Sequence, residues 1–219
     1  MKFVSNTEEL IEFKRCAEDP IYFISNYCYV WNGTDESNIY DRANSKVLLK
    51  LSDEQQNVIK SFVTEKKVVW QAERSTGETT TILAAYVYWF ARFKQDVICM
   101  CATPNRKMGD AIRSIIWYMH QNMPDFMKLE LDVNCASCMG FDNHSKIFYN
   151  TIGISATRGM RLDLLAIDEP SIASDRDLRE MMDFVHFSIG TNGGSLIIVG
   201  DKSLSLSTIS DDIRFAFRV

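Results

Sequence analysis

The chain has 219 residues, of which 46% are hydrophobic and 24% charged, and its formal net charge is −5. This length accommodates one well-buried domain, and this composition excludes low-complexity and collagen-like chains. The negative charge argues against nucleic-acid binding through a global positive field, so contact with DNA requires a local basic patch. No apolar run reaches the roughly 18 residues of a membrane span, and the amino terminus has no secretory apolar stretch, so we expect an intracellular protein.

The first part of the chain carries helix signals around a polar loop. Residues 7–15 place acids before basic residues, as a helix favours, and Asp19-Pro20 opens a second helical stretch that extends to Tyr27. The segment 31–45 is rich in Asn, Asp, Ser and Gly and reads as a surface loop. A third helix is expected to begin within residues 52–59. We treat residues 1–50 as a helical and loop lead-in packed on the core.

From residue 51 to residue 219 we expect one core domain without an interdomain linker. Short apolar runs predict strands at 68–72, 97–102, 147–150, 164–168 and 196–200. Helical patterns fill residues 79–94, 106–122 and 175–189. Uninterrupted apolar strands that alternate with helices are typical of an α/β fold, a mostly parallel sheet with helices on both faces.

A phosphate-loop pattern follows the first of these strands. The segment is Ala72-Glu73-Arg74-Ser75-Thr76-Gly77-Glu78-Thr79-Thr80. It matches the phosphate-binding loop G-x-x-x-x-G-K-[ST] at Gly77 and Thr79, with Ala72 at the first glycine and Glu78 at the lysine. The pattern therefore predicts a nucleotide site that carries an acid where a triphosphate needs a cation.

Glu78 is the residue with the largest expected effect on this site. At about 4 Å and an effective dielectric near 20, one unit charge pair is worth roughly 4 kcal/mol, so exchanging lysine for glutamate should weaken ATP binding severely. Arg74, four residues earlier, is a candidate replacement for the missing charge. Folding should be unharmed, because an acid in the first turn of a helix interacts well with the helix dipole.

A second motif is the apolar strand that ends in Asp168 and Glu169. In a nucleotide hydrolase of this architecture the first acid holds Mg²⁺ and the second polarises the attacking water. Arg158 lies shortly before this strand, next to a glycine, where a guanidinium can reach a phosphate. Each feature also has a plain structural explanation, since acids commonly end strands and loop cations are commonly solvated.

Taken together, the motifs resemble the ATPase domain of the large terminase subunit, the DNA-packaging motor of tailed bacteriophages. The similarity extends over roughly residues 19–200. It rests on Asp19-Pro20-Ile21-Tyr22-Phe23-Ile24, Gln55, Arg74-Ser75-Thr76-Gly77, Thr79-Thr80, Thr157-Arg158-Gly159 and Ile167-Asp168-Glu169. The resemblance implies a P-loop NTPase fold of the RecA/ASCE-like kind, with ATP and Mg²⁺ as ligands.

The resemblance also implies a role for each matching residue. Gln55 contacts the adenine, although Ser52 and Gln55 also form a capping-box pattern that occupies the same side chain. The backbone of Ser75, Thr76, Gly77, Glu78, Thr79 and Thr80 cradles phosphates at a helix amino terminus. Thr79 and Asp168 hold Mg²⁺, Glu169 is the catalytic acid, and Arg158 completes the site of a neighbouring subunit.

The partners implied by the resemblance are double-stranded DNA, further copies of the chain in a ring on a capsid portal, and the small terminase subunit. The expected location is the cytoplasm of the host cell, without a membrane. The chain departs from the family after its last predicted strand, where a threonine-rich coupling segment is replaced by Ile198-Val199-Gly200-Asp201-Lys202-Ser203. Because the sequence stops at Val219, we expect this chain not to cut DNA.

Two other hypotheses remain open from the sequence. Glu78 and the altered coupling segment favour a hydrolysis-dead relative that serves in assembly or interaction. The residues 167–170 also resemble the second motif of helicases, which need two such domains. Cys135 and Cys138 have C-x-x-C spacing near His144, so a zinc site is conceivable. No second pair completes a tetrahedral set, so we expect reduced thiols instead.

Overall fold

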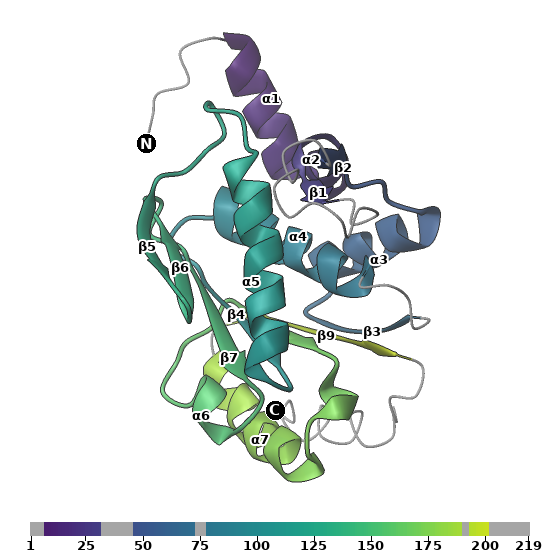
Figure 1. The fold of residues 1–219 in the computed structure, drawn as a ribbon, viewed down its shortest axis with the longest axis vertical. Coiled ribbons are helices and arrows are strands. Elements are labelled where there is room, and N and C mark those ends of the chain that lie inside the picture. The colour runs from purple at the N-terminus through teal and green to yellow at the C-terminus, as the bar shows by residue number, and fades with distance from the viewer. Residues whose placement is uncertain (1–6, 32–45, 73–77, 190–192, 202–219) are drawn as a thin grey trace, which may run out of the picture.

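A seven-stranded sheet forms the centre of the molecule (Figure 1). The computed structural model of the chain describes residues 7–31, 46–72, 78–189 and 193–201. The strand order is β3 (Lys67–Ala72), β9 (Ser195–Asp201), β8 (Leu164–Asp168), β4 (Ile98–Thr103), β7 (Lys146–Thr151), β6 (Cys138–Phe141) and β5 (Leu131–Cys135). The first five strands are parallel, and β6 and β5 continue the sheet antiparallel.

Helices cover both faces of this sheet, as the sequence predicts (Figure 1). One face carries α1 (Thr7–Glu18), α2 (Pro20–Tyr27), α3 (Asp53–Thr64), α4 (Glu78–Phe93) and α5 (Arg106–Gln121), and the other carries α6 (Ile154–Thr157) and α7 (Asp175–Ile189). Along β4 the side chains of Cys99 and Cys101 join the first cluster, whereas Met100 and Ala102 join the second. This alternation explains why the parallel strands are apolar throughout.

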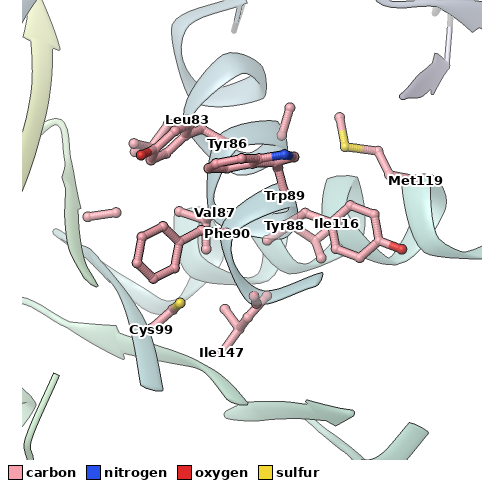
Figure 2. Packing of buried hydrophobic residues seen from close by; sticks show 14 of the residues in the cluster. Leu83, Tyr86, Val87, Tyr88, Trp89, Phe90, Cys99, Ile116, Met119 and Ile147 are labelled. Carbon is pink, nitrogen blue, oxygen red and sulfur yellow. The ribbon is translucent and has the colours of Figure 1, made fainter. Parts of the chain in front are cut away.

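Helix α4 forms the middle of the first cluster (Figure 2). Four of its five aromatic side chains are buried, and the polar atoms of two of these are paired with backbone carbonyls. The Tyr86 hydroxyl donates to the Phe62 carbonyl at 2.8 Å, and the Trp89 indole donates to the Cys16 carbonyl at 2.8 Å. The aromatic run of α4 therefore packs α1 and α3 against the sheet and is not available for base stacking.

Two short antiparallel pairs were not predicted from the sequence. β1 (Tyr29–Trp31) and β2 (Lys46–Leu48) pair at the ends of the segment that the composition predicts to be a loop. β5 and β6 form a hairpin whose closing residues are Cys135 and Cys138. A 3-10 helix η1 (Pro170–Ile172) follows β8. Within the described ranges no helix has the length and apolar character to cross a bilayer.

Candidate functional site

The candidate site lies at the edge of the sheet where the parallel strands end. β9 is inserted between β3 and β8, with Ala72 opposite Asp201 and Asp168 opposite Val199. The carboxyl ends of β3 and β8 therefore lie at one edge, where an open α/β sheet binds its ligands. Helix α4 begins at this edge, with Glu78 as its first residue. The predicted phosphate-loop residues Arg74, Ser75, Thr76 and Gly77, and the side chain of Glu78, lie outside what the structure describes.

One hydrogen bond connects the two predicted motifs. The Thr80 hydroxyl, in the first turn of α4, donates to Asp168 Oδ2 at 3.0 Å. This contact joins residues far apart in the sequence and places the amino end of α4 against the carboxyl end of β8. The hydroxyl that contacts Asp168 belongs to Thr80. The resemblance instead implies that Thr79 shares a bound Mg²⁺ with Asp168. Consecutive helical residues point about 100° apart, and the tertiary docking of α4 selects which one faces the acid. A role for Thr79 in metal binding stays a prediction.

Asp168 is an acid in an apolar environment. Its side chain is only 1% exposed, and among the described residues Oδ1 has no hydrogen-bond partner. Burial raises the pKa of Asp168 to about 6, against the hydrogen bond from Thr80, which lowers it, and with a contribution from the nearby Glu169 charge. A buried carboxylate oxygen without a donor suits a bound cation.

Glu169 has an unusual backbone conformation. Its φ and ψ are 50° and 49°, in the left-handed region that residues with a side chain rarely adopt. Its N–H donates to the Val199 carbonyl at 2.8 Å, which fixes the turn between β8 and η1 against β9. The side chain is half-buried and follows Asp168 directly. Such strain is concentrated at functional sites, and here it occurs at the predicted catalytic acid.

Gln55 takes part in a local capping box at the start of α3. Its side-chain oxygen accepts from the Ser52 N–H at 2.9 Å, and its own N–H donates to Ser52 Oγ at 3.3 Å. The capping interaction expected from the sequence is therefore present. The adenine contact implied by the resemblance stays a prediction, and it requires the carboxamide to reach a base while it caps the helix.

Arg158 lies on the side of the sheet that carries α6 and α7. It follows α6, and its exposed guanidinium lies over the Phe184 ring of α7 at 5.8 Å from the centroid. Gly159, the next residue, has a φ of +75°. The role of Arg158 in the active site of a neighbouring subunit stays a prediction.

Two further features bear on the predicted ligands. An apolar cavity of about 380 Å³ lies beside Thr81, one residue past Thr80, and is lined by Tyr29, Val30, Trp31, Ser114, Ile115 and Tyr118. The sequence analysis did not predict this cavity. The only signal in the sequence is the pair of aromatic residues at 29 and 31. Across the described ranges, no group of three or more His, Cys, Asp or Glu residues could hold a metal ion, so Cys135 and Cys138 gain no zinc-binding partner there.

No protein-family model matches the sequence. Its structure is similar to the large terminase of bacteriophage HK97, with a TM-score of 0.66 and 15% identity over 84% of this chain and 37% of that one. It is also similar to the large terminase ATPase domain of Thermus phage P74-26, with a TM-score of 0.54 and 11% identity over 69% and 64%. A third similar structure is the large terminase of a thermophilic bacteriophage in complex with ADP, with a TM-score of 0.53 and 12% identity over 74% and 44%.

These similarities establish the fold. The chain has the mostly parallel α/β architecture of the large terminase ATPase domains. It spans between about a third and two thirds of the length of each of these proteins.

Proposed function

We propose that the chain is the ATPase domain of a DNA-packaging motor of the large-terminase type, which uses ATP hydrolysis to move double-stranded DNA into a capsid. The observation that carries this proposal is the hydrogen bond between Thr80 and Asp168, in a fold shared with terminase ATPase domains. The proposal extends to ring assembly on a portal and to contact with a small terminase subunit.

The residues around Asp168 fit a bound Mg²⁺. Carboxylate and hydroxyl oxygens are the hard ligands that Mg²⁺ prefers, and Asp168 Oδ1 lacks a donor among the described residues. Asp168 with Thr80 or Thr79 would hold the ion beside the phosphates. When bound, Mg²⁺ neutralises charge on the β- and γ-phosphate oxygens.

The positions of the remaining residues support the roles that we propose for them. The amide groups at the start of α4 face the edge where β3 and β8 end, and the amino end of a helix attracts phosphate. Glu169 would orient a water for in-line attack on the γ-phosphate. Arg158 would offset the developing charge in the active site of an adjacent subunit, because it is exposed and lies away from the α4 face.

Glu78 makes the proposal testable by a single substitution. We expect Glu78→Lys to strengthen ATP binding at least tenfold, about 1.4 kcal/mol, because it replaces a charge repelled by the triphosphate with one that attracts it. ATP affinity and turnover should be measured for the unaltered chain, for Glu78→Lys, and for Glu78→Lys combined with Glu169→Gln. The third variant should bind ATP like the second and hydrolyse it far more slowly.

The same measurements separate the two alternatives. If neither the unaltered chain nor Glu78→Lys binds ATP, the hydrolysis-dead assembly protein becomes the better hypothesis, and Glu78 is the observation that favours it. Strand separation by the isolated chain would favour a helicase-like ATPase instead. Equal activity of Glu78→Lys with and without Glu169→Gln would exclude Glu169 as the catalytic acid.

A further inference from the structure

The C-x-x-C segment, which the proposed function leaves unused, closes the β5–β6 hairpin. Cys135 ends β5, Cys138 begins β6, and the two residues are register partners. Directly opposed residues of antiparallel strands share one face of the sheet, with Cα atoms about 4.5–5.5 Å apart. A disulfide needs a Cα separation of roughly 4.4–6.8 Å. The two thiols can therefore be joined without a large movement of the backbone.

Both cysteines are held in place by contacts outside the hairpin turn. Arg113 of α5 donates through Nε to the Cys135 carbonyl at 2.9 Å and through Nη2 to Asn134 Oδ1 at 2.5 Å. On the other strand, Cys138 pairs with Phe148 of β7, and the Ser137 carbonyl accepts from the Tyr149 N–H at 3.0 Å. The backbone positions needed for a disulfide are thus already set in the folded protein.

The two thiols have different environments. Cys135 is exposed, whereas Cys138 is 7% exposed. Cys135 Sγ lies 3.6 Å from Ser137 Oγ, and hydrogen bonding at this turn lowers the pKa of Cys135, whereas burial raises the pKa of Cys138. Charged groups around the turn include Arg113 near Cys135 and Lys146 near Cys138. Arg106 and Asp110 lie across a cavity of about 330 Å³ that Ser137 also lines.

We propose that Cys135 and Cys138 form a thiol–disulfide exchange site that reacts with small disulfides such as oxidised glutathione. The Cys135 thiolate attacks one glutathione sulfur, which forms a mixed disulfide and releases one glutathione thiolate. The Cys138 thiolate then attacks Cys135 Sγ, which forms the Cys135–Cys138 disulfide and releases the second glutathione. Two protein thiols are oxidised, one glutathione disulfide is reduced to two thiols, and the two protons pass through water to the released thiolates.

The remaining cysteines are protected from this reaction by burial. Cys16, Cys28, Cys99 and Cys101 are each 0% exposed. Thiolate character and access control such exchange, so the hairpin should react first. The site makes no use of the nucleotide or of the residues assigned to ATP hydrolysis, so it stands or fails independently of the proposed function.

The test is to incubate the folded full chain with oxidised glutathione and follow intact mass and alkylated peptides. We expect the unaltered chain to lose two hydrogens at Cys135 and Cys138. Cys138→Ser should stop at one bound glutathione on Cys135, and Cys135→Ser should form neither product. Reaction mainly at the buried cysteines, or no reaction at the hairpin of the folded chain, would overturn the proposal.

A second variant tests whether Ser137 makes Cys135 the more reactive thiol, and it keeps both cysteines. Ser137→Ala deletes the hydroxyl beside Cys135 Sγ and leaves both cysteines and their register. The rate of mixed-disulfide formation should fall severalfold near neutral pH, and its pH profile should move to higher pH. An unchanged profile would exclude Ser137 as a positioning residue.

Discussion

At Asp168, burial opposes the ionised form that the proposed chemistry needs. The carboxyl has its ordinary pKa of 3.8 when unfolded and about 6 in the folded chain. Between about pH 4 and pH 6 the folded state therefore binds more protons than the unfolded state. The contribution of Asp168 to the free energy of unfolding consequently falls as pH rises through this window. Above pH 6 the full cost of burying the ionised carboxylate is present.

We predict that Asp168→Asn is more stable than the unaltered chain at pH 7.5, by up to about 3 kcal/mol, because the amide keeps the shape and cannot ionise. The advantage should shrink towards pH 4. Urea denaturation at several pH values measures it, with Asp132→Asn as an exposed control that should change little. If Asp168→Asn is less stable than the unaltered chain at pH 7.5, burial of the ionised carboxylate does not destabilise the fold as predicted.

Among the helices, α3 offers a way to separate capping from ligand binding. Gln55→Glu keeps a side chain that can complete the capping box, and it removes the amide that could recognise adenine. We predict unchanged stability and weaker ATP binding, measured in the Glu78→Lys background. Ser52→Ala is the matched control, which should cost about 1 kcal/mol of stability and leave ATP affinity nearly unaltered. Equal ATP affinity of Gln55→Glu and its parent would leave Gln55 with the capping role alone.

The connection into β9 depends on a close backbone approach at Gly194. A Cβ at this position would lie 2.4 Å from the Leu162 carbonyl oxygen, so the backbone between α7 and β9 would have to move. We predict that Gly194→Ala costs about 2–4 kcal/mol in the free energy of unfolding. Gly193→Ala is the control, because its φ of +68° strains an alanine by about 1–2 kcal/mol without any clash. Similar losses in the two variants would mean that the clash is readily relieved.

The elements that sequence patterns predict are those with long apolar periodicity. All five parallel strands and the helices α4, α5 and α7 were predicted, because each buries a face that the sequence encodes locally. The β5–β6 hairpin was missed because Ala136 and Ser137 lack the Gly, Asn or Asp that two-residue hairpin turns favour, and because its strands are short. For the site, parallel-sheet topology predicts that the start of α4 lies close to Asp168. It does not predict that Thr80 rather than Thr79 contacts the acid, because this depends on how α4 packs against the sheet.

For the whole molecule, the two helical layers place the predicted groups in two different regions. Thr80 belongs to the layer of α4, whereas Arg158 belongs to the layer of α6 and α7. We propose that Arg158 acts in the active site of a second copy in a ring, because heterologous contacts bring unlike surfaces together.

We predict that subunits with different defects complement one another in the Glu78→Lys background. Arg158→Ala and Glu169→Gln chains should each be nearly inactive. An equimolar mixture of the two variants should recover about a quarter of the ATP turnover of the Glu78→Lys parent. In such a mixture one interface in four joins an intact Arg158 to an intact Glu169. ATP turnover of the mixtures measures this. Recovery that is absent while ring assembly is retained would place Arg158 outside the neighbour's site.

If Glu169 is the catalytic acid that we propose, its left-handed backbone makes heat resistance and ATP hydrolysis compete at this position. Glycine or asparagine would adopt this geometry with less strain than glutamate, by about 1 kcal/mol. Laboratory evolution that rewards only heat resistance should therefore discard the acid in favour of a smaller residue. Lineages that keep glutamate there under such pressure would reveal that turnover still matters to them.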